Sequence, residues 1–191
     1  MEREIVMESL RGRLLVASPG LADPNFHQTV VLIAAHGETG ALGLILNREL
    51  ELDLADGWER ISRQPCLRDQ KLRDGGPVQG ALMVLHDDRS MAEVVVLDDV
   101  YLSTDFKAVT SLIGTVEGRA EFYATHSGWG SGQLEAELAE GTWLVLPATA
   151  DHVFGDLDAF DLWKSARTDF GRREIQDLVS PRLLPDDPRT N

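Results

Sequence analysis

The stretch that decides the fold is TVVLIAAHGETGALGLIL, residues 29–46. It holds two apolar runs, 29–35 and 41–46, on either side of a five-residue loop that contains two glycines. Such runs around a short Gly-containing loop predict a β-hairpin. The apolar residues are continuous rather than alternating, so we expect both faces of the hairpin to be covered by other parts of the protein.

Further strands and helices are predicted on either side of this hairpin. Strand-like runs lie at 13–17, 81–85, 93–97, 119–125 and 142–146. Apolar residues at helical spacing predict helices around Leu54, Trp58 and Ile61, around Phe106, Val109 and Ile113, within 132–140, and around Trp163. The expected caps are Ser103 or Thr104 for the second helix, Asp158 for the last, and Asp151 for a short turn. Because many strands precede helices rather than alternating with them, this order favours an α+β fold.

Length and composition are typical of a single domain. The chain has 191 residues, of which 43% are hydrophobic and 26% charged. We predict one domain, 1–191, with a core of about 10–170. Residues 181–191 hold three of the eight prolines and are expected to form a loose tail.

Cysteine usage and hydropathy predict a cytoplasmic protein. Cys66 is the only cysteine, so an intrachain disulfide is excluded. The charged segment 1–8 is unlike a signal peptide. Apolar runs reach about six residues, far below the ~18 needed to cross a bilayer, so no membrane insertion is expected.

The charge balance disfavours direct contact with nucleic acid. The formal net charge is −14, whereas a large nucleic-acid footprint needs clustered Lys and Arg. One basic cluster keeps the alternative open, and it consists of Arg60, Arg63, Arg68, Lys71 and Arg73.

A Gly-rich loop is predicted at 125–132, between a strand and a helix. Its glycines and the helix N-terminus suit a phosphate or carboxylate. However, Gln133 stands where the dinucleotide fingerprint requires its third glycine, so a plain tight turn is the competing interpretation. Within this loop, Trp129 is either an exposed residue that contacts a partner or a buried side chain that covers a hydrophobic core.

No catalytic constellation is evident in the sequence. His126 and Ser127 are adjacent, but neighbouring strand residues point to opposite faces, and no G-x-S-x-G elbow occurs. The histidines form neither H-x-H nor H-E-x-x-H. We therefore predict no catalytic residues, no metal and no cofactor.

Several blocks, taken together, resemble the YqgE/AlgH family. They are LxGxLLxAxP at 10–19, DPxF at 23–26, GLxLNR at 43–48, GGPV at 75–78, LH at 85–86, SGWxxGQLExEL at 127–138 and GxW at 141–143, followed by Phe154. His126 and Ser131 depart from the pattern, in which an aromatic residue and a proline are common. The resemblance implies a bacterial α+β domain with a bifurcated, largely antiparallel sheet that includes a small β-barrel and is surrounded by helices. It implies no established activity, although some members carry a transcriptional-regulator label.

Three functions follow from these observations, in the order in which we rank them. The first is a non-catalytic regulatory or binding protein with an unknown protein or small-molecule partner. The second is a nucleotide or small-molecule binder, or an enzyme, that uses a groove lined by Asn47, Gly75, Gly76, His126, Trp129 and Gln133. The third is a transcriptional regulator that binds DNA directly.

Overall fold

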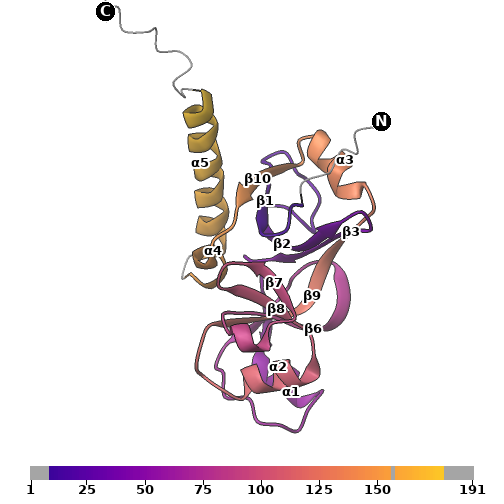
Figure 1. Ribbon diagram of the computed structural model, residues 1–191, viewed down its shortest axis with the longest axis vertical. Helices are drawn as coiled ribbons and strands as arrows, with labels where there is room; N and C mark the ends of the chain where they lie inside the picture. Colours follow the sequence, from indigo (N-terminus) through magenta and orange to yellow (C-terminus); the bar gives the residue numbers. More distant parts are fainter. Residues whose placement is uncertain (1–8, 156–157, 179–191) are drawn as a thin grey trace, which may run out of the picture.

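The computed structural model describes residues 9–155 and 158–178, and it confirms the predicted α+β class (Figure 1). Its strands are β1 (Arg13–Ala17), β2 (Val30–Gly37), β3 (Gly40–Ile45), β4 (Glu49–Asp53), β5 (Lys71–Arg73), β6 (Val78–His86), β7 (Val94–Leu97), β8 (Val100–Ser103), β9 (Ala120–Gly130) and β10 (Trp143–Pro147). Its helices are α1 (Leu54–Glu59), α2 (Phe106–Ile113), α3 (Gln133–Ala139), α4 (Ala150–Phe154), α5 (Ala159–Leu178) and the 3₁₀ turn Arg89–Met91.

The strands form one curled, mostly antiparallel sheet in the order β10-β1-β2-β3-β9-β6-β8-β7, with β4 and β5 branching from it. Strand β9 joins the two halves, because residues 127–130 pair with β3 while 120–126 pair with β6. Strand β5 adds the parallel pairing of Arg73 with Tyr123. The curl brings the edge strand β7 against β2, so the sheet forms a half-barrel.

The predicted hairpin is strands β2 and β3, and both of its faces are covered. Val30, Leu32 and Ala34 face the half-barrel core, whereas Val31 and Ile33 face a second core on the other side of the sheet. All five side chains are fully buried. The continuous apolar run therefore reflects two cores that share one strand.

Strand β9 overturns the prediction of a Gly-rich loop at 125–132. The strand continues through Gly130, and the turn is confined to residues 131–132 ahead of α3. Pairing with β3 holds the glycine-containing segment extended, since Ala41 and Gly43 pair with Trp129 and Ser127. The tight-turn alternative was therefore closer than the anion loop, although it placed the turn too early.

Helix ends differ from the sequence predictions at several positions. Helix α1 ends at Glu59, so Ile61 lies outside it and is exposed. Helix α2 is capped by Asp105, whose carboxylate accepts the Lys107 and Ala108 N–H groups. The N-cap of α4 is Thr149. Asp158 does accept the Asp161 N–H at the start of α5, as predicted.

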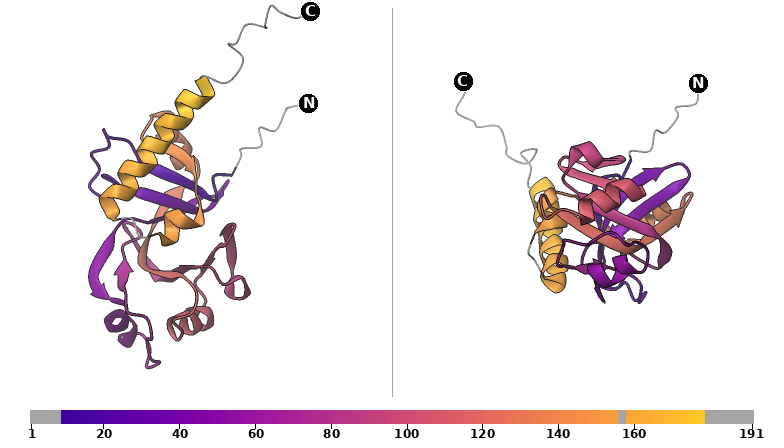
Figure 2. Two further views of the ribbon diagram at one scale, coloured as in Figure 1. Left: turned by 90° about the vertical axis from the view of Figure 1, so that its left-hand side faces the viewer. Right: turned by 90° about the horizontal axis from the view of Figure 1, so that it is seen from below.

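Helix α5 packs across the β1–β10 side of the sheet (Figure 2, left). Leu162, Trp163 and Ala166 join the half-barrel core, and the Trp163 indole donates to the Ala17 carbonyl at 2.9 Å. Among the described helices, none combines the length and apolarity needed to cross a bilayer. The predicted tail at 181–191 lies outside the described residues, and the single-domain prediction stays a prediction.

Candidate functional site

Gly75 and Gly76 pack against the backbone of β9. Ser127 Oγ donates to the Gly75 carbonyl at 2.9 Å. A Cβ on Gly75 would strike the Thr125 carbonyl oxygen, and one on Gly76 would lie 2.7 Å from the backbone of His126. Gly76 also has φ of +143°, so this close approach requires glycine. The contact fills the space beside β9, so these two glycines leave no room there for a ligand.

Trp129 and Gln133 belong to a cluster around Glu137, in which Trp129 is buried and Gln133 is exposed. Glu137 Oε2 accepts from the indole N–H groups of Trp129 and Trp143, at 2.9 and 2.8 Å. Its Oε1 accepts from Gln133 Nε2 at 3.0 Å. Phe26 stacks on Trp129, which is buried. Of the two alternatives that the sequence left open, Trp129 is therefore the buried side chain that covers a hydrophobic core.

Asn47 and His126 lie at two other places. The buried Asn47 amide accepts the Val30 N–H and donates to the carbonyls of Gln28 and Ala159, so it ties β2 to the start of α5. The His126 ring lies under Gly80 in β6, where a Cβ would be 3.1 Å from the ring. The six predicted residues therefore do not converge on one groove: Asn47 lines a polar cavity, and the other five line neither cavity described below.

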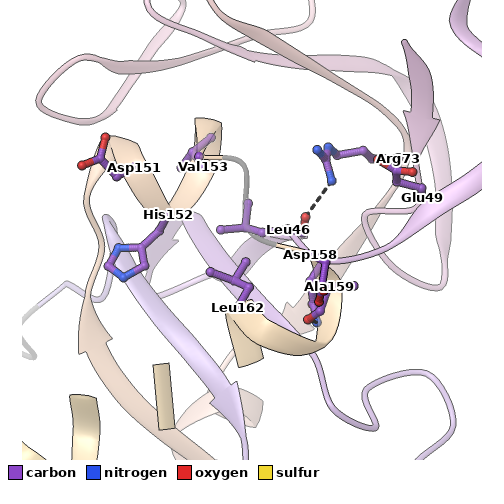
Figure 3. Close-up of a pocket in the computed structure, with 11 residues that line it drawn as sticks. Leu46, Glu49, Arg73, Asp151, His152, Val153, Asp158, Ala159 and Leu162 are labelled. Atoms are coloured by element: carbon purple, nitrogen blue, oxygen red, sulfur yellow. Dashed lines mark hydrogen bonds between the residues drawn. The ribbon is translucent and has the colours of Figure 1, made fainter. Parts of the chain in front are cut away.

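The polar cavity, of about 290 Å³, lies where β4 and β5 meet α4 and the start of α5 (Figure 3). Arg73 and Glu49 approach from one side, Asp151 and His152 from the other, and Leu46 and Leu162 lie between them. Polar side chains in this wall are used by the fold itself. Arg73 donates to Glu121 at 2.6 Å and to the Leu46 carbonyl at 3.0 Å.

Two groups in the polar cavity have shifted pKa values. Burial opposes the charge on Arg73, but the hydrogen bond to Glu121 helps to raise the pKa of its guanidinium overall. Burial lowers the pKa of His152, whose Nδ1 accepts the Thr149 N–H at 3.0 Å. The lower pKa favours the neutral form of His152, whose Nδ1 belongs to the α4 cap.

The second cavity is larger, at about 530 Å³, and is mostly apolar. It lies between α1 and α2, at the end of the molecule away from α3 and α5 (Figure 1). Its wall comes from six strands and helices, β4, α1, β5, β6, α2 and β9, and from residues next to them. The lining residues are Leu52, Leu54, Gly57, Trp58, Arg60, Ile61, Leu72, Gly80, Ala81, Leu82, Thr104, Phe106, Val109 and Ala124.

Aromatic and aliphatic side chains at the mouth of this apolar cavity are exposed. The Trp58 and Phe106 rings stack with centroids 5.7 Å apart. Phe106 is 57% exposed and Ile61 58% exposed. Large apolar side chains that remain exposed together beside a cavity are typical of a binding surface rather than of a finished core.

The electrostatics of the apolar cavity come from one residue. Arg60 is the single charged residue of the lining, and its side chain has no ion-pair partner in the part of the chain that the structure describes. Thr104 supplies the one hydroxyl group of the lining. The wall contains neither His, Cys nor a carboxylate, so it offers apolar contact and one positive charge rather than a general acid or base.

Three of the five residues in the basic cluster predicted at 60–73 form side-chain hydrogen bonds or ion pairs within this chain. Arg68 donates to the carbonyls of Leu112, Glu117 and Gly118, and Lys71 pairs with Glu51 at 3.0 Å. Arg73 pairs with Glu121 as described above. These side chains stabilise loops and strands of this chain instead of presenting a continuous positive surface.

Comparison with known proteins confirms the suspected relationship. A family model described as AlgH-like matches residues 14–173. The chain belongs to the AlgH-like family. It is 34% identical to a UPF0301 protein of Streptomyces avermitilis, with 97% of each chain covered, and 36% identical to one of Myxococcus xanthus, with 93% and 96% covered. The solution structure of the AlgH protein from Pseudomonas aeruginosa matches with a TM-score of 0.70 and 30% identity, covering 97% of this chain and 100% of that one.

Sequence reasoning missed the apolar cavity. The sequence predicted buried helix faces at Trp58, Ile61 and Phe106 from their spacing. This spacing does not distinguish a filled core from an open cavity. Leu52, Leu72 and Ala124 come from three strands, β4, β5 and β9, that are separated in the sequence, so their convergence needs the tertiary structure. The sequence singled out Arg60 only as part of a basic cluster and gave no sign that it lines a cavity.

Proposed function

We propose that this AlgH-like protein is a non-catalytic binding protein, and that the apolar cavity between α1 and α2 holds its ligand. The observation that carries the proposal is an open space of about 530 Å³ with an almost wholly apolar wall. Ligand sites in proteins are commonly clefts of ~300–1,000 Å³ with apolar linings and few polar groups. The ligand class that fits is an apolar body with one anionic group.

The anionic group is inferred from Arg60. An arginine guanidinium binds carboxylates and phosphates well, and Arg60 has no competing partner within the described residues. Because Arg60 is exposed, the pairing with a ligand anion is worth only ~0.2–1 kcal/mol. Most of the binding free energy must therefore come from apolar contact with the cavity wall.

Binding without catalysis is supported by the residues of the wall. Thr104 is the only hydroxyl of the lining, which contains no His, Cys, Asp or Glu. General acid–base catalysis needs a group within hydrogen-bond reach that exchanges protons near the working pH. This wall supplies binding energy and lacks such a group.

A cytoplasmic role without direct nucleic-acid contact is part of the same proposal. The net charge of −14 and the internal pairing of Arg68, Lys71 and Arg73 support it. Retention of DNA in a filter-binding assay at low salt would contradict this part of the proposal.

The test is a titration with linear carboxylates of four to twelve carbons, followed by calorimetry. Each methylene that enters the cavity contributes about 0.8 kcal/mol, so the Kd is expected to fall about fourfold per carbon until the cavity is full. Ala81→Trp, which fills the cavity, is expected to abolish binding. Ala35→Trp is the matched control, because Ala35 is an exposed strand alanine on β2.

Arg60 variants separate the charge from the apolar contact. Arg60→Ala is expected to weaken carboxylate binding by up to about fivefold, the ratio that corresponds to an exposed ion pair. Arg60→Lys should restore most of this loss. A Kd that does not change with chain length, or equal binding to wild type and Ala81→Trp, would refute the proposed site.

A further inference from the structure

The edge of β6 beside the apolar cavity has no strand partner. Residues 84–86 of β6 pair with β8, but β8 ends at Ser103, and from Thr104 the chain turns away into α2. Along Val78–Leu82, none of the described strands pairs with β6 on the side away from β9. Five residues of strand edge are therefore open at this place.

A bulge exposes the backbone of the same segment further. Gln79 pairs with Thr125 of β9, and the next pairing joins Met83 to Tyr123. Gly80, Ala81 and Leu82 thus stand opposite Ala124 alone, without a ladder partner of their own on either side. Backbone N–H and C=O groups need hydrogen-bond partners, so this segment is suited to an added chain.

The edge carries none of the side chains that usually prevent strand addition. Residues 78–82 read Val-Gln-Gly-Ala-Leu, without charge and without proline, and Val78 is 39% exposed. Natural proteins commonly protect such edges with Lys, Pro or a bulge. Here the bulge is present, and it turns Gly80–Leu82 toward the cavity that these residues line.

We propose that the occupant of the apolar cavity is an extended segment of a partner protein, which adds as a strand to residues 78–82 of β6 and inserts one large apolar side chain into the cavity. This inference rests on the proposed function, because it names the ligand of the same site. Strand addition gives affinity through the backbone and specificity through pockets for alternate side chains. An acidic residue of the segment pairs with Arg60.

A second copy of this chain is a poorer occupant. Each copy carries a net charge of −14, so two copies repel each other, whereas a heterologous segment has no such penalty.

The experiment selects from a display library of random ten-residue peptides on immobilised full-length protein, with counter-selection on Ala81→Trp. The expected result is a family of peptides that share one large apolar residue, with an acidic residue near it. Their binding should fall at least tenfold in Ala81→Trp and remain in Ala35→Trp. Absence of enrichment over the Ala81→Trp selection would overturn the inference.

Two further measurements separate the edge from the cavity. Val78→Pro places a proline on this edge outside the cavity lining, so it should weaken the selected peptides at least tenfold and leave decanoate binding unchanged. Methylating alternate peptide amides should abolish binding in one register and spare it in the other. Peptides insensitive to both changes would refute strand addition.

The outcomes also distinguish this inference from the function on which it rests. Carboxylates that bind with the expected chain-length dependence, without any selected peptide, would refute the peptide and keep the cavity as a small-molecule site. Failure of both ligand classes would refute both. A dimer in sedimentation that Val78→Lys dissociates would show that the occupant is a second copy. Circular dichroism and cooperative urea unfolding check that each variant folds.

Discussion

The Glu137 cluster makes a quantitative prediction about the signature block 127–143. Glu137 accepts two indole N–H groups with one oxygen atom, from Trp129 in β9 and Trp143 in β10. Glu137→Leu puts an apolar side chain of similar size in the place of the carboxylate, which leaves both indole N–H groups without a partner. Trp129 and Trp143 are 5% and 4% exposed, so water reaches them poorly.

The expected loss of stability follows from these two donors. A buried donor left unpaired costs ~1–3 kcal/mol, so with two donors we expect Glu137→Leu to lower the free energy of unfolding by about 2–6 kcal/mol. Glu137→Gln keeps one carbonyl oxygen that accepts both indoles, and it loses the charge and the acceptor for Gln133 Nε2. We expect that variant to cost about 1 kcal/mol.

Urea unfolding monitored by tryptophan fluorescence and by circular dichroism measures both values. Combining Glu137→Leu with Trp143→Phe tests the mechanism, because the double variant should lose less than the sum of the single losses. A loss below about 0.5 kcal/mol in Glu137→Leu, or equal losses in Glu137→Leu and Glu137→Gln, would refute this reading of the cluster.

Three further predictions concern stability. The Tyr123 hydroxyl is buried and has no hydrogen-bond partner within the described residues, so Tyr123→Phe should raise Tm by about 2–4 °C. Burial also raises the pKa of Tyr123, so wild type should lose stability as pH rises above ~10, and thermal melts of Tyr123→Phe should lose less. Gly132→Ala should lower the free energy of unfolding by about 1 kcal/mol because φ is +72°, whereas Gly171→Ala inside α5 should raise it by up to about 1 kcal/mol. Urea unfolding in which both variants gain stability, or both lose it, would contradict this. The hydrogen bond to its own backbone N–H and the one from His36 lower the pKa of Glu135, so stability is lost as pH falls below ~4.3, and acid titration of Glu135→Gln should show a smaller loss.

The hairpin at 29–46 was predictable because its signal is local. A continuous apolar run on each side of a glycine-containing loop specifies both the strands and their burial on two faces. Strand β1 was also predicted with the observed bounds, 13–17. In these segments the hydrophobic pattern and the turn chemistry agree, so no distant contact was needed to settle the structure.

The end of β9 was not predictable, because its strand conformation depends on a distant partner. Gly128 and Gly130 read as a loop by composition. In the fold, Gly43 of β3 leaves room for the Trp129 ring, and a Cβ there would lie 3.0 Å from Trp129 Cζ3 and 2.7 Å from Val31 Cγ1. Complementarity of this kind, between residues 86 positions apart in sequence, is a property of the packed sheet.

The candidate site shows the same difference between local sequence patterns, which can be recognised, and contacts between distant residues, which cannot. The sequence directed attention to Gly75, Gly76 and Trp129, which are unusual residue types in a compact pattern, and these build turns and a core. The cavity residues are ordinary apolar side chains spread over 52–124. Only their arrangement around an empty space distinguishes them from a core.

The most direct test of the central claim is the location of a bound apolar anion. Backbone amide chemical shifts of ¹⁵N-labelled protein, measured during a titration with decanoate, report that location residue by residue. The account predicts progressive shifts at Gly57, Gly80 and Leu82 and none at Asn47 or Ala159 beside the polar cavity. Shifts confined to the polar cavity, or an unchanged spectrum at saturating decanoate, would contradict it.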